Sequence, residues 1–246
     1  MVNRQKFPKL ANSKILNRQD ITDDLLIMWI EKPDGFSFKA GQYCTIGSGG
    51  IERAYSIVSA PYEDSLELFV ELVPPPDGAL TPLLWNLYPG DFVTIRPRAK
   101  GVFVFKPTAK HHFLISTVTG VVPYVSFIRD YLQKDVRNHK FYILQGASYW
   151  DEFTYFDELS EISRQHPTLS KYVPTISRPS ESHNSGWKGE TGRVNQIVEK
   201  YIEEFGLSAE DTLVYACGHP GMIEDVKEQL LPRGFNLEEE RFWKDD

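Results

Sequence analysis

The sequence is poor in cysteine, with only Cys44 and Cys217 among its 246 residues. Two cysteines provide neither a disulfide framework nor the thiolates of an iron–sulfur cluster, so any one-electron metal centre must reside on a partner. The six histidines show no metal-ligand spacing, because the adjacent His111 and His112 would point to opposite faces of a strand. We therefore expect no metal site.

Long apolar runs are also lacking. No stretch approaches the roughly 20 apolar residues of a membrane-spanning helix, and the charged start of the chain is not followed by the apolar core of a signal peptide. A cytoplasmic location is the expectation that follows. What is present is a globular composition, 41% hydrophobic and 25% charged, over a length that suits two domains of ordinary size.

Acidic residues are missing from two stretches, residues 1–18 and 92–112. The formal net charge of -7 arises elsewhere, since residues 1–110 carry 13 Lys+Arg against 12 Asp+Glu and the remainder carries 14 against 22. A basic face on an acidic protein indicates either steering of an acidic partner or strand edges kept charged against aggregation. Nucleic acid is not expected, because no aromatic-basic motif for bases occurs.

The first hundred residues show the short β-branched and aromatic runs of strands, separated by turn residues. Their spacing predicts an antiparallel β-barrel. Residues 81–87 interrupt them as one helical turn, with Thr81 as its cap and Pro82 at the first helical position. The predicted strands are residues 11–17, 25–31, 41–46, 53–59, 66–73 and 92–96.

After Pro107 strands alternate with helices, which predicts a parallel sheet in a doubly wound α/β domain. We place the domains at residues 1–107 and 108–246, and we interpret residues 177–191 as a long loop on the ligand side. The predicted strands are residues 111–116, 140–145, 169–176 and 212–217, and the predicted helices are residues 123–134, 154–165, 193–205 and 220–233.

One stretch of the barrel carries chemistry. Arg53, Tyr55 and Ser56 lie on one extended segment, and they offer a phosphate-binding fork, a flat stacking face and a small hydroxyl to a planar ligand with a diphosphate. This pattern predicts a flavin site. Taken alone, the stretch Arg53-Ala54-Tyr55-Ser56 also fits an ordinary barrel strand with a surface arginine.

Ligands of a doubly wound sheet bind beyond the carboxyl ends of its strands, where helix N-termini present free amides. There Arg178 and Arg193 together suit a phosphate clamp, whereas each taken singly also fits a surface arginine. Cys217 is either a buried filler or a contact to a bound ring. Four segments occupy this edge, namely residues 116–123, 145–148, 176–178 with 192–193, and 215–222.

Three motifs in this order resemble those of the ferredoxin-NADP reductase superfamily, closest to the bacterial ferredoxin/flavodoxin-NADP reductases. Arg53-Ala54-Tyr55-Ser56 resembles the family's Arg-x-Tyr-Ser flavin signature. Residues 117–123 resemble its Thr-Gly-Thr-Gly-x-x-Pro nucleotide loop, and residues 215–220 resemble its Cys-Gly-Asn-Pro segment. The resemblance covers nearly the whole chain and implies a Greek-key flavin barrel followed by a nucleotide-binding α/β domain.

The resemblance implies an FAD site in the first domain. Arg53 would bind the diphosphate, Tyr55 would lie against the isoalloxazine or ribityl chain, and Ser56 would hydrogen-bond near the flavin N5. Backbone amides and a helix N-terminus around residues 78–81 would add to the diphosphate site. The implied FAD-binding residues are Arg53, Ala54, Tyr55, Ser56, Phe69, Gly78, Ala79, Leu80, Thr81, Thr117, Phe242 and Trp243.

The resemblance also implies an NADP(H) site in the second domain. Arg178 and Arg193 match the positions that hold the adenosine 2′-phosphate, and Ser56 and Cys217 would border the hydride path as catalytic positions. The implied NADP-binding residues are Thr119, Gly120, Pro123, Ser148, Arg178, Arg193, Cys217, Gly218 and Met222.

Three positions depart from the family's pattern. Val118 stands where the family usually has glycine, Ser148 where many bacterial relatives have arginine, and His219 where they have asparagine. These changes predict altered affinity for the pyridine nucleotide and altered 2′-phosphate selectivity.

The function predicted from the resemblance is FAD-dependent hydride transfer with NADP(H), followed by single-electron exchange with an acidic ferredoxin or flavodoxin, by a monomer. One alternative is an NAD(P)H-dependent reductase component of an oxygenase system. Another is a flavin-binding redox-sensing or electron-transfer subunit without hydride transfer of its own.

Overall fold

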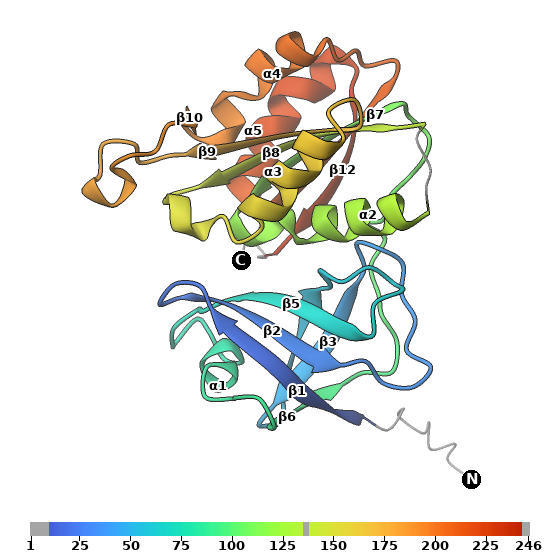
Figure 1. The fold of residues 1–246 in the computed structure, drawn as a ribbon, viewed down its shortest axis with the longest axis vertical. Coiled ribbons are helices and arrows are strands. Elements are labelled where there is room, and N and C mark those ends of the chain that lie inside the picture. The colour runs from blue at the N-terminus through green and yellow to red at the C-terminus, as the bar shows by residue number, and fades with distance from the viewer. Residues whose placement is uncertain (1–9, 135–137, 243–246) are drawn as a thin grey trace. The chain divides into compact units, whose positions relative to one another are not determined.

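The computed structural model describes residues 10–134 and 138–242. The chain divides into two compact units, residues 1–104 and 105–246, which are described separately (Figure 1).

The first unit is an antiparallel barrel whose strand order is β4-β3-β6-β1-β2-β5. The barrel is nearly closed, because the amide of Val58, just after β4, donates a 2.9 Å hydrogen bond to the carbonyl of Glu67 on β5. This confirms the predicted fold of the first half. The strands are β1 Ala11–Asp20, β2 Leu25–Glu31, β3 Tyr43–Ser48, β4 Ile51–Ser56, β5 Ser65–Glu71 and β6 Phe92–Ile95.

Alternation of side chains builds the core of this unit. Along β1, Ser13 and Ile15 are buried while Asn12, Lys14 and Leu16 are exposed, which is the period of two that a half-covered strand requires. The opposing strands contribute further fully buried residues to the same core, including Met28, Ile46, Leu68 and Ile95.

Helix α1, Thr81–Leu84, covers the barrel through buried Leu80 and Leu84. The predicted capping role of Thr81 is wrong. Leu80 occupies the N-cap without a side-chain hydrogen bond, and Pro82 is the second helical residue rather than the first. The Thr81 hydroxyl instead donates to the carbonyl of Val73 and accepts from its amide, both at 3.0 Å. It therefore joins the helix to the end of β5.

The second unit is a fully parallel sheet with strand order β10-β9-β8-β7-β11-β12. Its strands are β7 His111–Thr117, β8 Lys140–Ala147, β9 Ser170–Ile176, β10 Glu190–Thr191, β11 Thr212–Gly218 and β12 Asn236–Arg241. Its α-helices are α2 Val122–Gln133, α3 Phe156–Gln165, α4 Val198–Phe205 and α5 Pro220–Leu230. Its 3-10 turns are η1 Val118–Val121, η2 Trp150–Glu152, η3 Ser182–Asn184, η4 Val194–Gln196 and η5 Leu231–Arg233.

Helices cover both faces of this sheet. Helices α4 and α5 pack on the face that carries Val214 and Ala216. The intervening Tyr215 points the other way and contacts Phe127 of α2, with ring centroids 5.5 Å apart, while α3 reaches the same face through Phe156 and Tyr172 of β9. The doubly wound arrangement predicted from the alternation is thereby confirmed.

The sheet contains two strands that the prediction missed. Strand β10 lies inside the predicted loop 177–191, and β12 follows the last predicted helix. The predicted helix 193–205 is interrupted, since η4 covers its start and α4 begins at Val198. The predicted helix 220–233 ends as α5 at Leu230 and continues as the separate turn η5.

Candidate functional site

Strand β4 presents the predicted flavin motif at the edge of the barrel order, paired only with β3 among the named strands. Arg53 and Ala54 are exposed, and Tyr55 is half-buried against the barrel core. Burial raises the pKa of Tyr55, while the positive charge of Arg53 opposes this rise. The phenol is therefore neutral at physiological pH and offers both a flat face and an O–H donor. Ser56 ends the strand and is half-buried.

The second predicted flavin segment is a tight loop after β5. The Gly78 amide donates to the carbonyl of Pro74 at 2.9 Å. A Cβ added at Gly78 would approach the Val73 carbonyl to under 3.0 Å, so only glycine fits there. Helix α1, which follows this loop, has four residues and is too short to contribute a strong dipole. Phe69, also predicted for this site, is buried on β5.

Four predicted residues meet at the carboxyl edge of the parallel sheet, where the turn after β7 touches the turn after β11. The Thr117 hydroxyl accepts a 3.0 Å hydrogen bond from the amide of His219. A Cβ at Gly120 would come within 3.0 Å of the Cys217 carbonyl, and one at Gly218 would come within 3.0 Å of the Thr117 hydroxyl. Small residues thus let two turns pack backbone to backbone, which is the local geometry that brings main-chain amides near a phosphate.

Val118 lies in this edge with a backbone φ of +35°. A β-branched residue adopts this left-handed region at a cost of about 1–2 kcal/mol. The carbonyl of Val118 accepts from Gln145 Nε2 at 3.1 Å, and Gln145 Oε1 accepts from the Tyr172 hydroxyl at 2.7 Å. The Val118 side chain also packs on a small apolar cluster of Ala147, Phe153 and Ile176. Hydrogen bonds and packing together hold the glycine-like backbone at this departure from the family pattern.

Cys217 is fully buried at the end of β11. Burial raises the pKa of its thiol, and the negative charge of Glu240 on β12 raises it further. A thiol in this state is neither a nucleophile nor an acid at neutral pH. Pro123 and Met222 are likewise buried, in α2 and α5, so their side chains shape the edge from within.

His219 takes the capping role that asparagine commonly has. Its Nδ1 accepts from the amide of Gly221 at 3.0 Å, and Pro220 begins helix α5 behind it. A side-chain acceptor at the N-cap satisfies one of the free amides of the first turn. The replacement of asparagine at this position therefore preserves the helix start.

The two predicted arginines follow the ends of two neighbouring parallel strands, β9 and β10. Thr191 of β10 pairs with Ile176 of β9, and the Gly192 amide donates to the Ile176 carbonyl at 2.8 Å. Arg178 and Arg193 each follow two residues after this pair. Because adjacent strands are about 5 Å apart, both exposed arginines lie at the same edge of the sheet.

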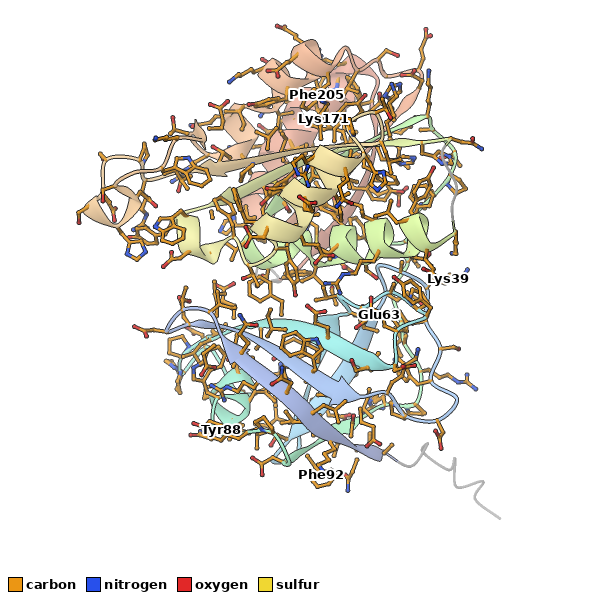
Figure 2. The ribbon with its side chains drawn as sticks, in the orientation of Figure 1. Lys39, Glu63, Tyr88, Phe92, Lys171 and Phe205 are labelled. Carbon is orange, nitrogen blue, oxygen red and sulfur yellow. The ribbon has the colours of Figure 1, made fainter. Side chains whose placement is uncertain are left out.

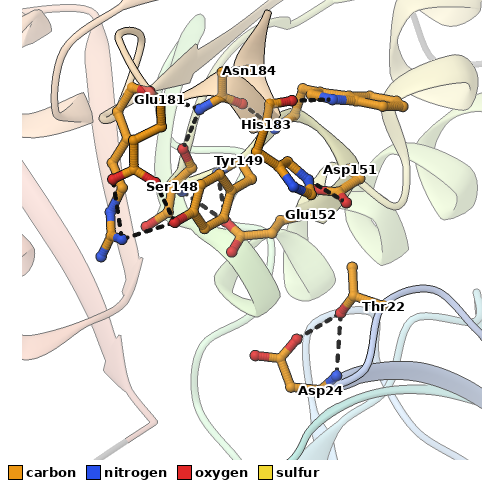
Figure 3. Close-up of polar contacts among 11 residues, drawn as sticks. Thr22, Asp24, Ser148, Tyr149, Asp151, Glu152, Glu181, His183 and Asn184 are labelled. Carbon is orange, nitrogen blue, oxygen red and sulfur yellow. Dashed lines mark hydrogen bonds and ion pairs between the residues drawn. The ribbon is translucent and has the colours of Figure 1, made fainter.

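A network that sequence reasoning missed surrounds Arg178 (Figure 3). Its Nη1 donates to the Tyr149 hydroxyl at 2.9 Å and lies 3.5 Å from Glu181 Oε1. The same hydroxyl donates to Glu181 Oε2 at 2.6 Å. The hydrogen bond to Glu181 raises the pKa of the Tyr149 phenol. The signal available in the sequence was an acid three residues after the arginine.

The loops after β8 and β9 are joined by hydrogen bonds next to this network. Buried Asn184 donates to the carbonyls of Ser148 and Arg178, at 3.0 and 2.9 Å, and accepts from the amide of Trp150. Glu152 accepts from the amides of Ser148 and Tyr149. Ser148 thus contributes contacts through its backbone amide and carbonyl.

Part of the predicted basic surface is used inside the first unit. Arg18 donates to the carbonyls of Trp85 and Leu87, and its guanidinium lies 4.9 Å from the ring centroid of Tyr88. Tyr88 is labelled in Figure 2. Arg96 makes two hydrogen bonds to Glu52, at 3.0 and 2.6 Å. Lys14, Arg98 and Lys100 are exposed. Residues 1–9 lie outside the described part of the chain.

Of the two C-terminal aromatic residues predicted to bind FAD, the structure describes one. Phe242 is half-buried directly after β12, and Trp243 lies outside the described residues. Among the residues that the structure describes, no three His, Cys, Asp or Glu side chains are grouped as metal ligands. Within residues 10–134 and 138–242, no helix has the length and apolarity to cross a membrane.

Comparison with known proteins places these features in a family. Residues 114–228 match the family model described as the oxidoreductase NAD-binding domain. The chain is 32% identical over 184 residues to the flavodoxin/ferredoxin--NADP reductase of Buchnera aphidicola subsp. Schizaphis graminum, covering 72% of this chain and 68% of that one. It is 29% identical over 244 residues to the ferredoxin--NADP reductase of Pseudomonas aeruginosa, covering 93% and 92%.

A solved structure agrees over nearly the full length. The ferredoxin NADP+ reductase from Neisseria gonorrhoeae with bound FAD and NADP has a TM-score of 0.82 and 25% sequence identity, covering 96% of this chain and 99% of that one. The barrel, the parallel sheet and the order of the motifs all agree with this family. The chain therefore belongs to the ferredoxin-NADP reductase superfamily, close to its bacterial members.

Proposed function

We propose that this protein is a ferredoxin/flavodoxin-NADP+ reductase that binds FAD in the barrel and NADP(H) in the α/β unit. The bound flavin supplies hydride and single-electron chemistry, and the protein positions it and tunes its surroundings. The main support for the proposal is that the turns after β7 and β11 are in close contact at one sheet edge. The residues in contact are Thr117, Gly120, Cys217 and Gly218. This contact supports a nucleotide site because the glycines there leave no room for a side chain and bring two backbones together.

In the barrel, the residues of β4 fit a flavin by their donor chemistry. The exposed guanidinium of Arg53 is available to a diphosphate, for which its planar fork is suited. The neutral phenol of Tyr55 has one face packed on the core, which orients the ring for stacking. Ser56 adds a small hydroxyl at the end of the same strand.

In the α/β unit, Arg178 and Arg193 are proposed to hold the phosphate of the adenosine ribose. Their matching positions, two residues beyond the paired ends of β9 and β10, support this assignment. Ser56 and Cys217 are proposed to border the reacting rings. Because burial raises the pKa of the Cys217 thiol, we assign Cys217 a packing contact and no proton transfer.

The electron partner is proposed to be an acidic ferredoxin or flavodoxin. Exposed Lys14, Arg98 and Lys100 support this choice by charge. Their effect is expected mainly on the association rate, which should fall with ionic strength. We propose that the protein acts as a cytoplasmic monomer, which size-exclusion chromatography and fractionation would check.

The absorbance spectrum of the purified protein tests the proposed function. We expect a flavin spectrum that bleaches when NADPH is added without oxygen, followed by electron transfer to added ferredoxin or flavodoxin. A colourless protein that takes up no FAD on reconstitution would exclude the proposal. A flavin that stays oxidised in NADPH would instead favour the redox-sensing or electron-transfer subunit.

A further inference from the structure

The proposed phosphate-binding residue Arg178 is already engaged by an acid of its own loop. Glu181 lies three residues downstream, with Oε1 3.5 Å from Arg178 Nη1. The Tyr149 hydroxyl stands between the two, accepting from Arg178 and donating to Glu181 (Figure 3). The three side chains form a closed polar triangle that leaves the arginine with a neutralising partner.

This triangle lies where nucleotide selectivity is decided in doubly wound folds. An acidic side chain at such an edge accepts a hydrogen bond from the ribose 2′-hydroxyl of NAD, whereas an arginine accommodates the 2′-phosphate of NADP. Here both groups stand within one loop. Ser148, on the neighbouring strand end, adds no positive charge.

The triangle of Arg178, Tyr149 and Glu181 is held in place by its loop and is accessible to a ligand. Asn184 fixes the loop through hydrogen bonds to the carbonyls of Ser148 and Arg178. The side chains of Arg178 and Glu181 are 51% and 47% exposed. A ligand can therefore reach both groups without unfolding the loop.

We propose that Glu181 is a second nucleotide-specificity residue that opposes Arg178 and makes the site accept NADP(H) and NAD(H) with weak discrimination. The inference rests on the proposed function. Without ligand, the carboxylate of Glu181 pairs with the guanidinium of Arg178. With NAD(H), it accepts from the ribose 2′-hydroxyl. With NADP(H), a phosphate carrying up to two negative charges must share Arg178 with Glu181, so the phosphate gains less than it would from a free arginine.

Ligand binding tests this role independently of turnover. Flavin-loaded protein is titrated calorimetrically with adenosine 2′,5′-bisphosphate and with 5′-AMP, and the ratio of the two dissociation constants is the readout. Glu181→Gln removes the charge and keeps the shape. We expect it to tighten the bisphosphate about fivefold, as removal of one exposed like charge predicts, and to leave 5′-AMP unchanged or weaker.

A matched variant controls for net charge. Glu161 pairs with Arg164 three residues away on α3, so Glu161→Gln removes the same type of exposed pair outside the triangle. We expect no change in the ratio for this control. Equal shifts in the two variants, or an equal gain for both ligands in Glu181→Gln, would overturn the role of Glu181.

The outcome also separates this inference from the proposed function. If the wild-type flavin is reduced by NADPH and the ratio is unaffected by Glu181→Gln, only the specificity role fails. If the wild-type protein binds neither probe and its flavin is not reduced, the nucleotide site itself is refuted, and both proposals fail.

Discussion

The hydroxyl of Thr117 accepts a hydrogen bond from the amide of His219, 102 residues later in the chain, at 3.0 Å. This bond ties the turn after β7 to the turn after β11 and leaves room only for a glycine at position 218. At this candidate nucleotide-binding edge, the two turns are therefore held together by close backbone contacts. The structure of the edge depends on small residues more than on charged ones.

Gly218→Ala tests that dependence. Gly218 has a φ of +121°, and an added Cβ would collide with the Thr117 hydroxyl. We expect a loss of about 1–3 kcal/mol in unfolding free energy together with weaker binding of NADP+, measured by urea unfolding and calorimetry. Gly186→Ala is the control, because Gly186 has a φ of +97° with no atom within 4 Å of the added Cβ. Similar losses in both variants would show that the close approach at Gly218 is unimportant.

Substitutions at Val118 test its left-handed backbone. At a φ of +35°, glycine is favoured over alanine by about 1 kcal/mol, the reverse of the usual order. We expect Val118→Gly to lie within about 1 kcal/mol of wild type, since release of strain offsets lost packing and added chain entropy. Val118→Ala should be less stable than Val118→Gly in urea unfolding. An alanine variant that is more stable would contradict the strained geometry.

Arg53→Ala tests the flavin end. Arg53 is exposed, so the fold should survive, while loss of a charge-assisted phosphate contact should weaken FAD binding about tenfold or more. The measurement is the flavin-to-protein ratio after dialysis. Arg98→Ala removes another exposed arginine of the barrel and should retain FAD. A fully flavinated Arg53→Ala protein would exclude the role given to Arg53.

The buried His112 is expected to make the free energy of unfolding depend on pH. Its ring is 0% exposed, packed against Phe105 and Phe141 at centroid distances of 4.7 and 5.4 Å. Burial, assisted by the nearby His139, lowers the pKa of His112 from 6.5 to about 3. The unfolded chain therefore binds the proton first as the pH falls. Stability from this group is intact above pH 6.5 and decreases by up to about 1.4 kcal/mol per pH unit toward pH 3.

The variant His112→Phe isolates that contribution. Phenylalanine retains a ring among the same neighbours and cannot be protonated. We expect urea unfolding of His112→Phe to vary less between pH 6.5 and pH 5 than unfolding of the wild type. Parallel pH profiles for the two proteins would refute a buried, neutral His112.

Much of the fold was predictable because its strongest signals are local. The runs around Ile15, Met28 and Val214 alternate or repeat as buried strands do, and glycines mark the turns between them. Strand β12 was not predicted, because the three consecutive acids Glu238, Glu239 and Glu240 are more typical of a solvated segment than of a strand. It lies at the edge of the sheet order and pairs with β11.

The sequence motifs predicted which residues form the candidate site. They did not predict that Glu181 pairs with Arg178 there. The register of β9 and β10 brings Arg178 and Arg193 to one edge, as expected for Arg178 after a predicted strand and Arg193 at the start of a predicted helix. The pairing of Arg178 with Glu181 depends on how the loop folds back toward Tyr149. That path is determined by Asn184 and its contacts across two loops, and no local pattern encodes it.

The late position of β12 has a consequence for synthesis on the ribosome. All six strands of the barrel lie before residue 96, so this unit can close while the rest of the chain is still being translated. The parallel sheet cannot be completed at that stage, because β11 pairs along Leu213–Gly218 with residues 236–241. Until those residues emerge, β11 presents an open edge that can recruit other nascent chains. The α/β unit should therefore be the part that depends on chaperones at high expression.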